Sequence, residues 1–213
     1  MNIIILGDKF QKRMKSKGCV GLFKSGNDYL IIKQYKVLKK IFPKAKIIYV
    51  HGFEHKKLLI ALDEYPEIKQ DIELVYNPDY DLYNYGASLH LVREYLNDDV
   101  IIMFGDAIID KSLFVKFDLK QKTSQIIINN QSNNKLGCVV NQLKIENIFY
   151  DLDNRIEEIY LLCKQDAMIL INFLNSKSQA IKNMFIFEII NKLIDMQVNI
   201  KHQITRTKRK NVI

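Results

Sequence analysis

The sequence predicts an α/β fold with a mostly parallel central sheet sandwiched between helices. Apolar runs rich in Ile and Val recur along the chain, and most of them do not alternate with polar residues, which is typical of strands covered on both faces. Segments with helical periodicity lie between these runs. This alternation predicts parallel strands joined by right-handed crossovers.

The apolar runs are the predicted strands of the first half, and the segments between them are its predicted helices. The runs are residues 3–6, 46–50, 72–76, 100–104 and 125–129. Residues 30–42 carry apolar side chains at helical spacing and stop before Pro43, which cannot continue a helix. Further helices are predicted over 53–64 and 88–96.

The pattern changes after about residue 120. Residues 136–151 predict two short strands with a turn at Asn141 and Gln142. Two long helical stretches are predicted next, over about 155–175 and 178–196, and a strand-like piece follows at 199–205. We therefore expect one domain over residues 1–205 and a basic tail at 206–213.

The helical interpretation of the second half carries expectations for individual side chains. Glu157 and Glu158 are expected as a pair on a helix surface. Phe185 and Phe187 are expected in the core rather than at a binding surface.

The composition is that of an ordinary globular protein. Of the 213 residues, 48% are hydrophobic and 26% are charged. No apolar run approaches the ~20 residues that span a bilayer, and residues 3–6 are too short an apolar stretch for a signal peptide. We expect a cytoplasmic protein without a membrane partner, and the sequence leaves its oligomeric state open, a homodimer included.

The cysteines and histidines do not form a metal-binding motif. Cys19, Cys138 and Cys163 are far apart, and an odd count without a CxxC argues against a disulfide framework and against zinc. Of the four histidines, only His51 and His55 could share a helix face, and no acidic third ligand is placed to complete a site.

The net charge of +8 is concentrated in two places. One is the loop after the first strand, which holds Lys9, Lys12, Arg13, Lys15 and Lys17. Phosphate groups commonly bind at this location in α/β proteins, so the loop is a candidate phosphate site. The other is the tail at 206–213, which lacks interleaved aromatic residues and so argues against a nucleic-acid partner.

Four segments are expected to converge beyond the carboxyl ends of the strands, where doubly wound sheets bind their ligands. They are residues 7–18, 50–52, 77–89 and 104–110. The last reads FGDAIID, and a carboxylate that ends a buried strand needs a partner such as a metal or a phosphate-bearing ligand.

Residues 72–110, IELVYNPDYDLYNYGASLHLVREYLNDDVIIMFGDAIID, resemble the central part of the nucleotidyltransferases with a GT-A-type Rossmann-like fold. They are most like the sugar-phosphate and phosphocholine cytidylyltransferase branch. In that branch a strand ends in a "YNP.Y" turn, an "N…SL" helix follows, and the next strand ends in Gly-Asp. The resemblance extends over about residues 1–205.

The resemblance implies a reaction. A phosphorylated acceptor, such as a sugar phosphate or phosphocholine, attacks the α-phosphorus of an NTP, with CTP or UTP favoured, and pyrophosphate leaves. Mg²⁺ and basic side chains neutralise the phosphoryl charge. Asp106 matches the family's metal-binding Asp, and Asp110 is either a second ligand or the cap of a short helix.

The remaining site residues are expected at the same crevice. The basic catalytic residues are Lys9 and Arg13. Glu158 and Tyr160 are expected near the acceptor pocket. The nucleotide-binding set is Leu6, Gly7, Asn84, Gly86, Ser88 and Gly105.

The first loop departs from the family pattern. The family has LAAGxGxR followed by a Pro-Lys pair, whereas residues 6–23 read LGDKFQKRMKSKGCVGLF, with Val20 and Gly21 in place of Pro-Lys. Lys9, Lys12, Lys15 or Lys24 could substitute for the missing lysine. The family's second acidic ligand, on a late strand, has no match here, so that ligand lies elsewhere or metal binding is weakened.

Three interpretations therefore remain at this stage. The first is an active nucleotidyltransferase with a rebuilt phosphate loop. The second is a nucleotide- or sugar-phosphate-binding domain that has lost turnover. The third is a glycosyltransferase of the same fold that uses a nucleotide-sugar.

Overall fold

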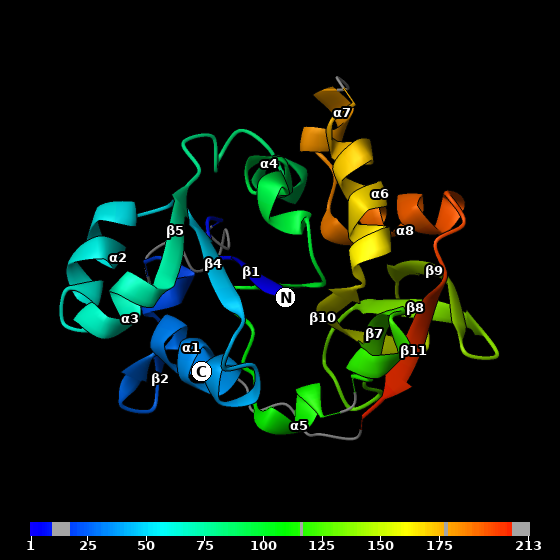
Figure 1. Cartoon of the computed structure of the whole chain (residues 1–213), viewed down its shortest axis with the longest axis horizontal. Coiled ribbons are helices and arrows are strands. Elements are labelled where there is room, and N and C mark those ends of the chain that lie inside the picture. Colours follow the sequence, from blue (N-terminus) through cyan, green and yellow to red (C-terminus); the bar gives the residue numbers. More distant parts are fainter. Residues whose placement is uncertain (10–17, 116, 177–178, 206–213) are drawn as a thin grey trace.

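The computed structural model describes residues 1–9, 18–115, 117–176 and 179–205. One sheet of nine strands runs through this part of the chain in the order β5-β4-β1-β6-β10-β7-β11-β9-β8. Helices cover both of its faces (Figure 1). The predicted α/β fold is confirmed.

The first half of the chain builds a parallel sheet of four strands. The strands are β1 (Asn2–Leu6), β4 (Lys46–His51), β5 (Ile72–Tyr76) and β6 (Val100–Phe104), and all of their pairings are parallel. The helices between them are α1 (Leu30–Ile41), α2 (His55–Leu62), α3 (Pro66–Asp71) and α4 (Tyr85–Leu91). A small hairpin of β2 (Lys24–Ser25) and β3 (Asp28–Tyr29) precedes α1.

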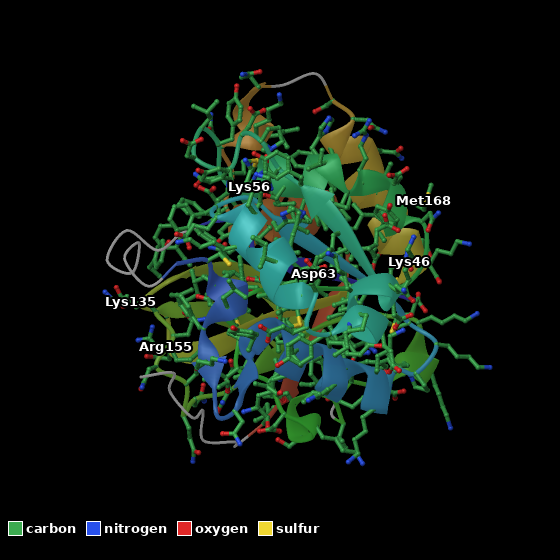
Figure 2. The ribbon with its side chains drawn as sticks, turned by 90° about the vertical axis from the view of Figure 1, so that its left-hand side faces the viewer. Lys46, Lys56, Asp63, Lys135, Arg155 and Met168 are labelled. Carbon is green, nitrogen blue, oxygen red and sulfur yellow. The ribbon has the colours of Figure 1, made fainter. Side chains whose placement is uncertain are left out.

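The strands of this half are buried on both faces, as their continuous apolar sequences predict. In β1, Ile3 and Ile5 pack into a core with α1 and α2, whereas Ile4 and Leu6 pack into the opposite core with α4. Figure 2 shows α2 from outside, with the exposed Lys56 and Asp63 on the side away from the sheet. The sheet thus holds the carboxyl ends of β1 and β6 rigidly side by side.

The second half makes the sheet mixed: the four strands of the first half are parallel as predicted, and in the second half only the β7–β11 pair among the described strands is parallel. Its strands are β7 (Ser124–Ile128), β8 (Leu136–Asn141), β9 (Lys144–Tyr150), β10 (Asn154–Leu162) and β11 (Ile200–Ile204). β10 is antiparallel to β6, β7 and β8, and β11 pairs with both β7 and β9. With the β8–β9 hairpin, these pairings close a ring of five strands.

The helix predicted from about residue 155 is wrong over its first part, because Asn154–Leu162 is the strand β10. Ile156, Ile159 and Tyr160 are all buried, and their spacing imitates one face of a helix. The pairing of β10 with β7 shifts register between Glu157 and Tyr160, and this irregularity breaks the two-residue period of a regular strand.

Glu157 is consequently not on a helix surface. It is 1% exposed and accepts a hydrogen bond from Asn129 Nδ2 (2.7 Å).

The remaining helices cover the second half of the sheet. They are α5 (Lys111–Phe114), α6 (Lys164–Leu174), α7 (Gln179–Lys182) and α8 (Ile186–Asp195). The predicted helix at 88–96 begins earlier, at Tyr85, and ends at Leu91, and a 3₁₀ turn at Arg93–Leu96 follows it. In the described part of the chain, no helix is both long enough and apolar enough to cross a bilayer. The basic tail at 206–213 lies outside the described residues.

Candidate active site

Two Gly-Asp pairs lie side by side where the strand order reverses. From β1 the chain moves to β4 and β5 on one side, and then returns to β6 on the other. Leu6 and Phe104 are in register, and each is followed by a Gly-Asp pair, Gly7-Asp8 and Gly105-Asp106. Because open α/β sheets bind ligands at such a switch point, beyond the carboxyl ends of the strands, both carboxylates stand at the expected crevice.

Sequence reasoning found Asp106 and missed Asp8. The signal was present, because LGD at residues 6–8 repeats the FGD of residues 104–106 after an equally apolar run.

Tyr49 of β4 explains the glycines at this place. Its side chain is fully buried, and a methyl group would lie 2.1 Å from its hydroxyl oxygen at Gly7, 2.5 Å at Gly21 and 2.9 Å at Gly105. The glycines therefore make room for the tyrosine ring beneath the crevice. Burial, with Cys19, Asp8 and Asp106 nearby, holds the Tyr49 pKa well above its ordinary value, so the phenol stays neutral.

Asp8 ties three segments together at the end of β1. Its side chain is fully buried, and its Oδ2 accepts hydrogen bonds from Asn77 Nδ2 and Ser88 Oγ, both at 2.8 Å. Lys9 Nζ lies 3.3 Å from the same oxygen. The other carboxylate oxygen, Oδ1, is buried and has no hydrogen-bond partner among the residues that the structure describes.

Lys9 holds the loop after β5. Its ammonium donates to the carbonyl oxygens of Tyr80 (2.7 Å) and Tyr83 (2.6 Å). Burial lowers the Lys9 pKa, and the charge of Asp8 opposes this shift. These contacts give Lys9 a positioning role in this structure, whereas the sequence suggested a catalytic one. Arg13, Lys12 and Lys15 lie outside the described residues.

The groups expected to bind nucleotide at the start of α4 are engaged inside the protein. Asn84 Nδ2 donates to the carbonyl of Asn183 (2.7 Å), and the Gly86 amide donates to the carbonyl of Met184 (3.0 Å). Ser88 is buried on Asp8. Asn84 and Gly86 thus fasten α4 to the segment that joins α7 and α8.

A pocket of about 250 Å³ opens on the other side of the crevice, where β6 meets β10. Its walls carry two carboxylates, Asp106 and Glu158, from these neighbouring strands. The other lining residues are Tyr85, Phe104, Asn134, Leu136, Tyr150, Phe185, Ile186 and Phe187.

Aromatic rings dominate this pocket and contact one another. Tyr85 packs edge-on against Phe104, with ring centroids 4.7 Å apart, and Tyr150 packs edge-on against Phe187 at 5.4 Å. Phe185 stacks on Phe187 at 5.9 Å. The expectation that Phe185 and Phe187 serve only the core is therefore incomplete, because both line the pocket.

The charged side chains among the described residues that line the pocket are the carboxylates of Asp106 and Glu158. Among the described residues that line it there is no lysine or arginine. Burial raises the pKa of Tyr85 well above its ordinary value, and Asp106, Asp8 and Glu158 raise it further, because each disfavours a second negative charge. Tyr85 is therefore a neutral phenol beside these carboxylates.

Glu158 and Tyr160, which the sequence places near an acceptor pocket, lie in different surroundings. Glu158 lines the pocket where β6 meets β10 and accepts a hydrogen bond from Asn134 Nδ2 (3.1 Å). Tyr160 does not line it: its side chain is fully buried in the core between the sheet and the C-terminal helices, and its hydroxyl has no partner.

Asp110 acts as a helix cap. Its Oδ1 accepts a hydrogen bond from the Ser112 amide (2.7 Å) at the start of α5, which is one of the two alternatives that the sequence left open. In the residues that the structure describes, no group of three or more His, Cys, Asp or Glu side chains could hold a metal ion. Mg²⁺ needs only one or two carboxylates when phosphate oxygens and water complete its shell, so the half-buried Asp106 on the pocket wall fits it.

No protein-family model and no curated protein matches the sequence. Solved structures match it over most of its length. CTP:phosphocholine cytidylyltransferase from Streptococcus pneumoniae is 18% identical with a TM-score of 0.74, over 97% of this chain and 90% of that one. A nucleoside-diphosphate-sugar pyrophosphorylase from Vibrio cholerae is 10% identical with a TM-score of 0.75, over 97% and 92%.

The inositol-1-phosphate CTP transferase from T. maritima is 15% identical with a TM-score of 0.71, over 95% of this chain and 84% of that one. The chain therefore has the fold of these nucleotidyl-transferring enzymes, as the resemblance of residues 72–110 predicted.

Proposed function

We propose that the protein transfers a nucleotidyl group from CTP or UTP to a phosphorylated acceptor with a cationic head, phosphocholine being the model acceptor, and releases pyrophosphate. The observation that carries this proposal is the pocket beside Asp106, whose lining combines aromatic rings with the carboxylates of Asp106 and Glu158. The shared fold and the position of the pocket at the strand-order switch point support it.

The pocket matches a quaternary ammonium group in both of its properties. Faces of Tyr and Phe rings attract a cation, at about 0.5–2 kcal/mol for each well-placed ring. Glu158 and Asp106 add the attraction of negative charge.

The reaction is the one that the resemblance implies, and the position of the pocket between two carboxylate-bearing strands supports it. An oxygen of the acceptor phosphate attacks the α-phosphorus of the NTP, the bond from that phosphorus to the β-bridging oxygen breaks, and pyrophosphate carries the electron pair away. Asp106 is the residue that would hold Mg²⁺, and Mg²⁺ supplies neutralisation of the phosphoryl oxygens. Glu158 and the aromatic rings orient the acceptor, and Lys9 fixes the loop after β5.

Pyrophosphate release with an acceptor panel tests the proposal. We expect release with CTP or UTP when phosphocholine is added, and much slower release with glucose 1-phosphate. Glu158→Gln should raise the KM for phosphocholine roughly tenfold with little change in kcat, because one charge interaction in a half-buried site is worth about 1–2 kcal/mol. Glu146→Gln, an exposed site on the β8–β9 hairpin, is the matched control.

Other outcomes separate the remaining interpretations. Binding of NTP without pyrophosphate release from any acceptor would favour a domain that has lost turnover. Hydrolysis of a nucleotide-sugar, with free NTP ignored, would favour a glycosyltransferase.

A further inference from the structure

One oxygen of the buried Asp8 carboxylate is an unused hydrogen-bond acceptor, and a buried unused acceptor lowers the stability of the fold. Its Oδ2 is satisfied by Asn77 and Ser88, and the whole side chain is 0% exposed. Its Oδ1 is buried without a partner. Because a buried acceptor without a donor destabilises a fold, its presence here points to a donor that arrives with a ligand.

The chemistry around Asp8 narrows the kind of ligand group. A carboxylate accepts hydrogen bonds and repels phosphate oxygens. Lys9, the cation beside it, already donates to the carbonyls of Tyr80 and Tyr83. The group that meets Oδ1 is therefore a neutral or cationic hydrogen-bond donor rather than a phosphate.

The topology indicates which part of a nucleotide this is. The acceptor pocket and Asp106 lie on the β6–β10 side of the crevice, and Asp8 stands at the end of β1 toward β4 and β5. A nucleotide that reacts at Asp106 and spans the crevice places its base on the Asp8 side. Two aromatic residues lie on that side: the Phe53 amide donates to the Asp8 carbonyl (3.0 Å), and the Phe53 ring lies 6.2 Å from the Tyr80 ring between centroids.

We propose that Asp8 reads the base: its Oδ1 accepts a hydrogen bond from the exocyclic amino group of cytosine or adenine and so selects amino bases over their keto counterparts. The inference rests on the proposed nucleotidyl transfer and assigns the base that this transfer uses. A keto oxygen at the same position meets Oδ1 as a second acceptor, which leaves both groups unpaired.

The Asp8→Asn variant gives the sharpest test. Oδ2 must continue to accept from Asn77 and Ser88, so the new amide keeps its oxygen there and turns its NH₂ to the position of Oδ1. The donor then faces the base, and the preference reverses. Wild type should bind CTP at least about tenfold more tightly than UTP, and ATP more tightly than ITP, whereas Asp8→Asn should favour UTP and ITP.

Isothermal titration calorimetry with each triphosphate measures these affinities. The control is Asp63→Asn, which changes an exposed aspartate at the end of α2 and should keep the wild-type order of affinities for the triphosphates. An unchanged CTP-to-UTP ratio in Asp8→Asn, or equal affinities in the wild type, overturns the role of Asp8. If Asp8→Asn does not fold, the test uses the wild type and a changed ligand instead. This ligand is the triphosphate of pyrimidin-2-one riboside, which lacks the 4-amino group of cytosine. Wild type should bind this analogue at least about tenfold more weakly than CTP, and equal binding overturns the inference.

Failure of this inference is distinguishable from failure of the proposed function. Equal binding of CTP and UTP, with pyrophosphate released from both, removes only the base assignment. No binding of any triphosphate removes the transfer reaction as well.

Discussion

The contact of Gly21 with Tyr49 makes a quantitative prediction about how the crevice floor is built. A methyl group at Gly21 would lie 2.5 Å from the Tyr49 hydroxyl oxygen, but 3.2 Å from both Tyr49 Cζ and Leu58 Cδ1. Nearly all of the steric conflict is therefore with one oxygen atom. Gly21→Ala should lower the free energy of unfolding by about 1–3 kcal/mol, which is the usual cost of overpacking a core.

Tyr49→Phe removes that oxygen, and the oxygen has no hydrogen-bond partner to lose. The single change should therefore be neutral or stabilising. In the Tyr49→Phe background, Gly21→Ala should cost less than about 1 kcal/mol, so the coupling energy of the pair is about 1–2 kcal/mol.

Gly7→Ala is the internal control for this cycle. Its methyl group would lie 2.1 Å from the Tyr49 hydroxyl oxygen and 2.3 Å from Cζ, so Tyr49→Phe leaves the conflict in place. Urea unfolding of the four proteins in each cycle gives the coupling energies. If Gly21→Ala costs the same in both backgrounds, or costs nothing, the account of the glycines is wrong.

Three further predictions concern residues around the crevice. Gly86→Ala places a methyl group 1.8 Å from the Ile181 carbonyl oxygen, and because backbone cannot rotate away the variant should lose at least about 2 kcal/mol of stability in urea unfolding. Asp110→Ala should lose about 1 kcal/mol from the cap of α5 and leave the Mg²⁺ dependence of pyrophosphate release unchanged; a higher Mg²⁺ requirement would restore Asp110 as a ligand. Burial, aided by the charge of His55, lowers the pKa of His51 from 6.5 to about 4, so the unfolded chain binds a proton before the folded chain does as the pH falls. The free energy of unfolding of the wild type should therefore decrease by about 2 kcal/mol between about pH 6.5 and pH 5. In His51→Gln this decrease should be absent.

The strands and the place of the crevice could be predicted from the sequence because the evidence for them is local. Strands buried on both faces require continuous apolar sequence, and the runs ending at Leu6 and Phe104 show it. The strand β10 could not be predicted in the same way, since its irregular pairing with β7 gives Ile156, Ile159 and Tyr160 a helical spacing.

The contents of the site were harder to predict because they depend on residues that only tertiary structure brings together. Tyr49 fills space under three glycines from different segments, whereas the sequence assigned two of them, Gly7 and Gly105, to nucleotide binding. The acceptor pocket takes Tyr85 from α4, Glu158 from β10 and Phe187 from α8. No spacing along the chain records that association, and the importance of Asp8 emerges only from its partners Asn77 and Ser88.

The central claim is that the crevice between Asp8 and Asp106 transfers a nucleotidyl group to a phosphorylated, cationic acceptor. Phosphorus NMR of the full chain with CTP, phosphocholine and Mg²⁺ tests it most directly, because it identifies both products. The account predicts pyrophosphate and a CMP–phosphocholine diphosphate diester in equal amounts, and loss of both with Asp106→Asn. Unchanged CTP and phosphocholine spectra with the wild-type protein, or undiminished product with Asp106→Asn, would contradict it.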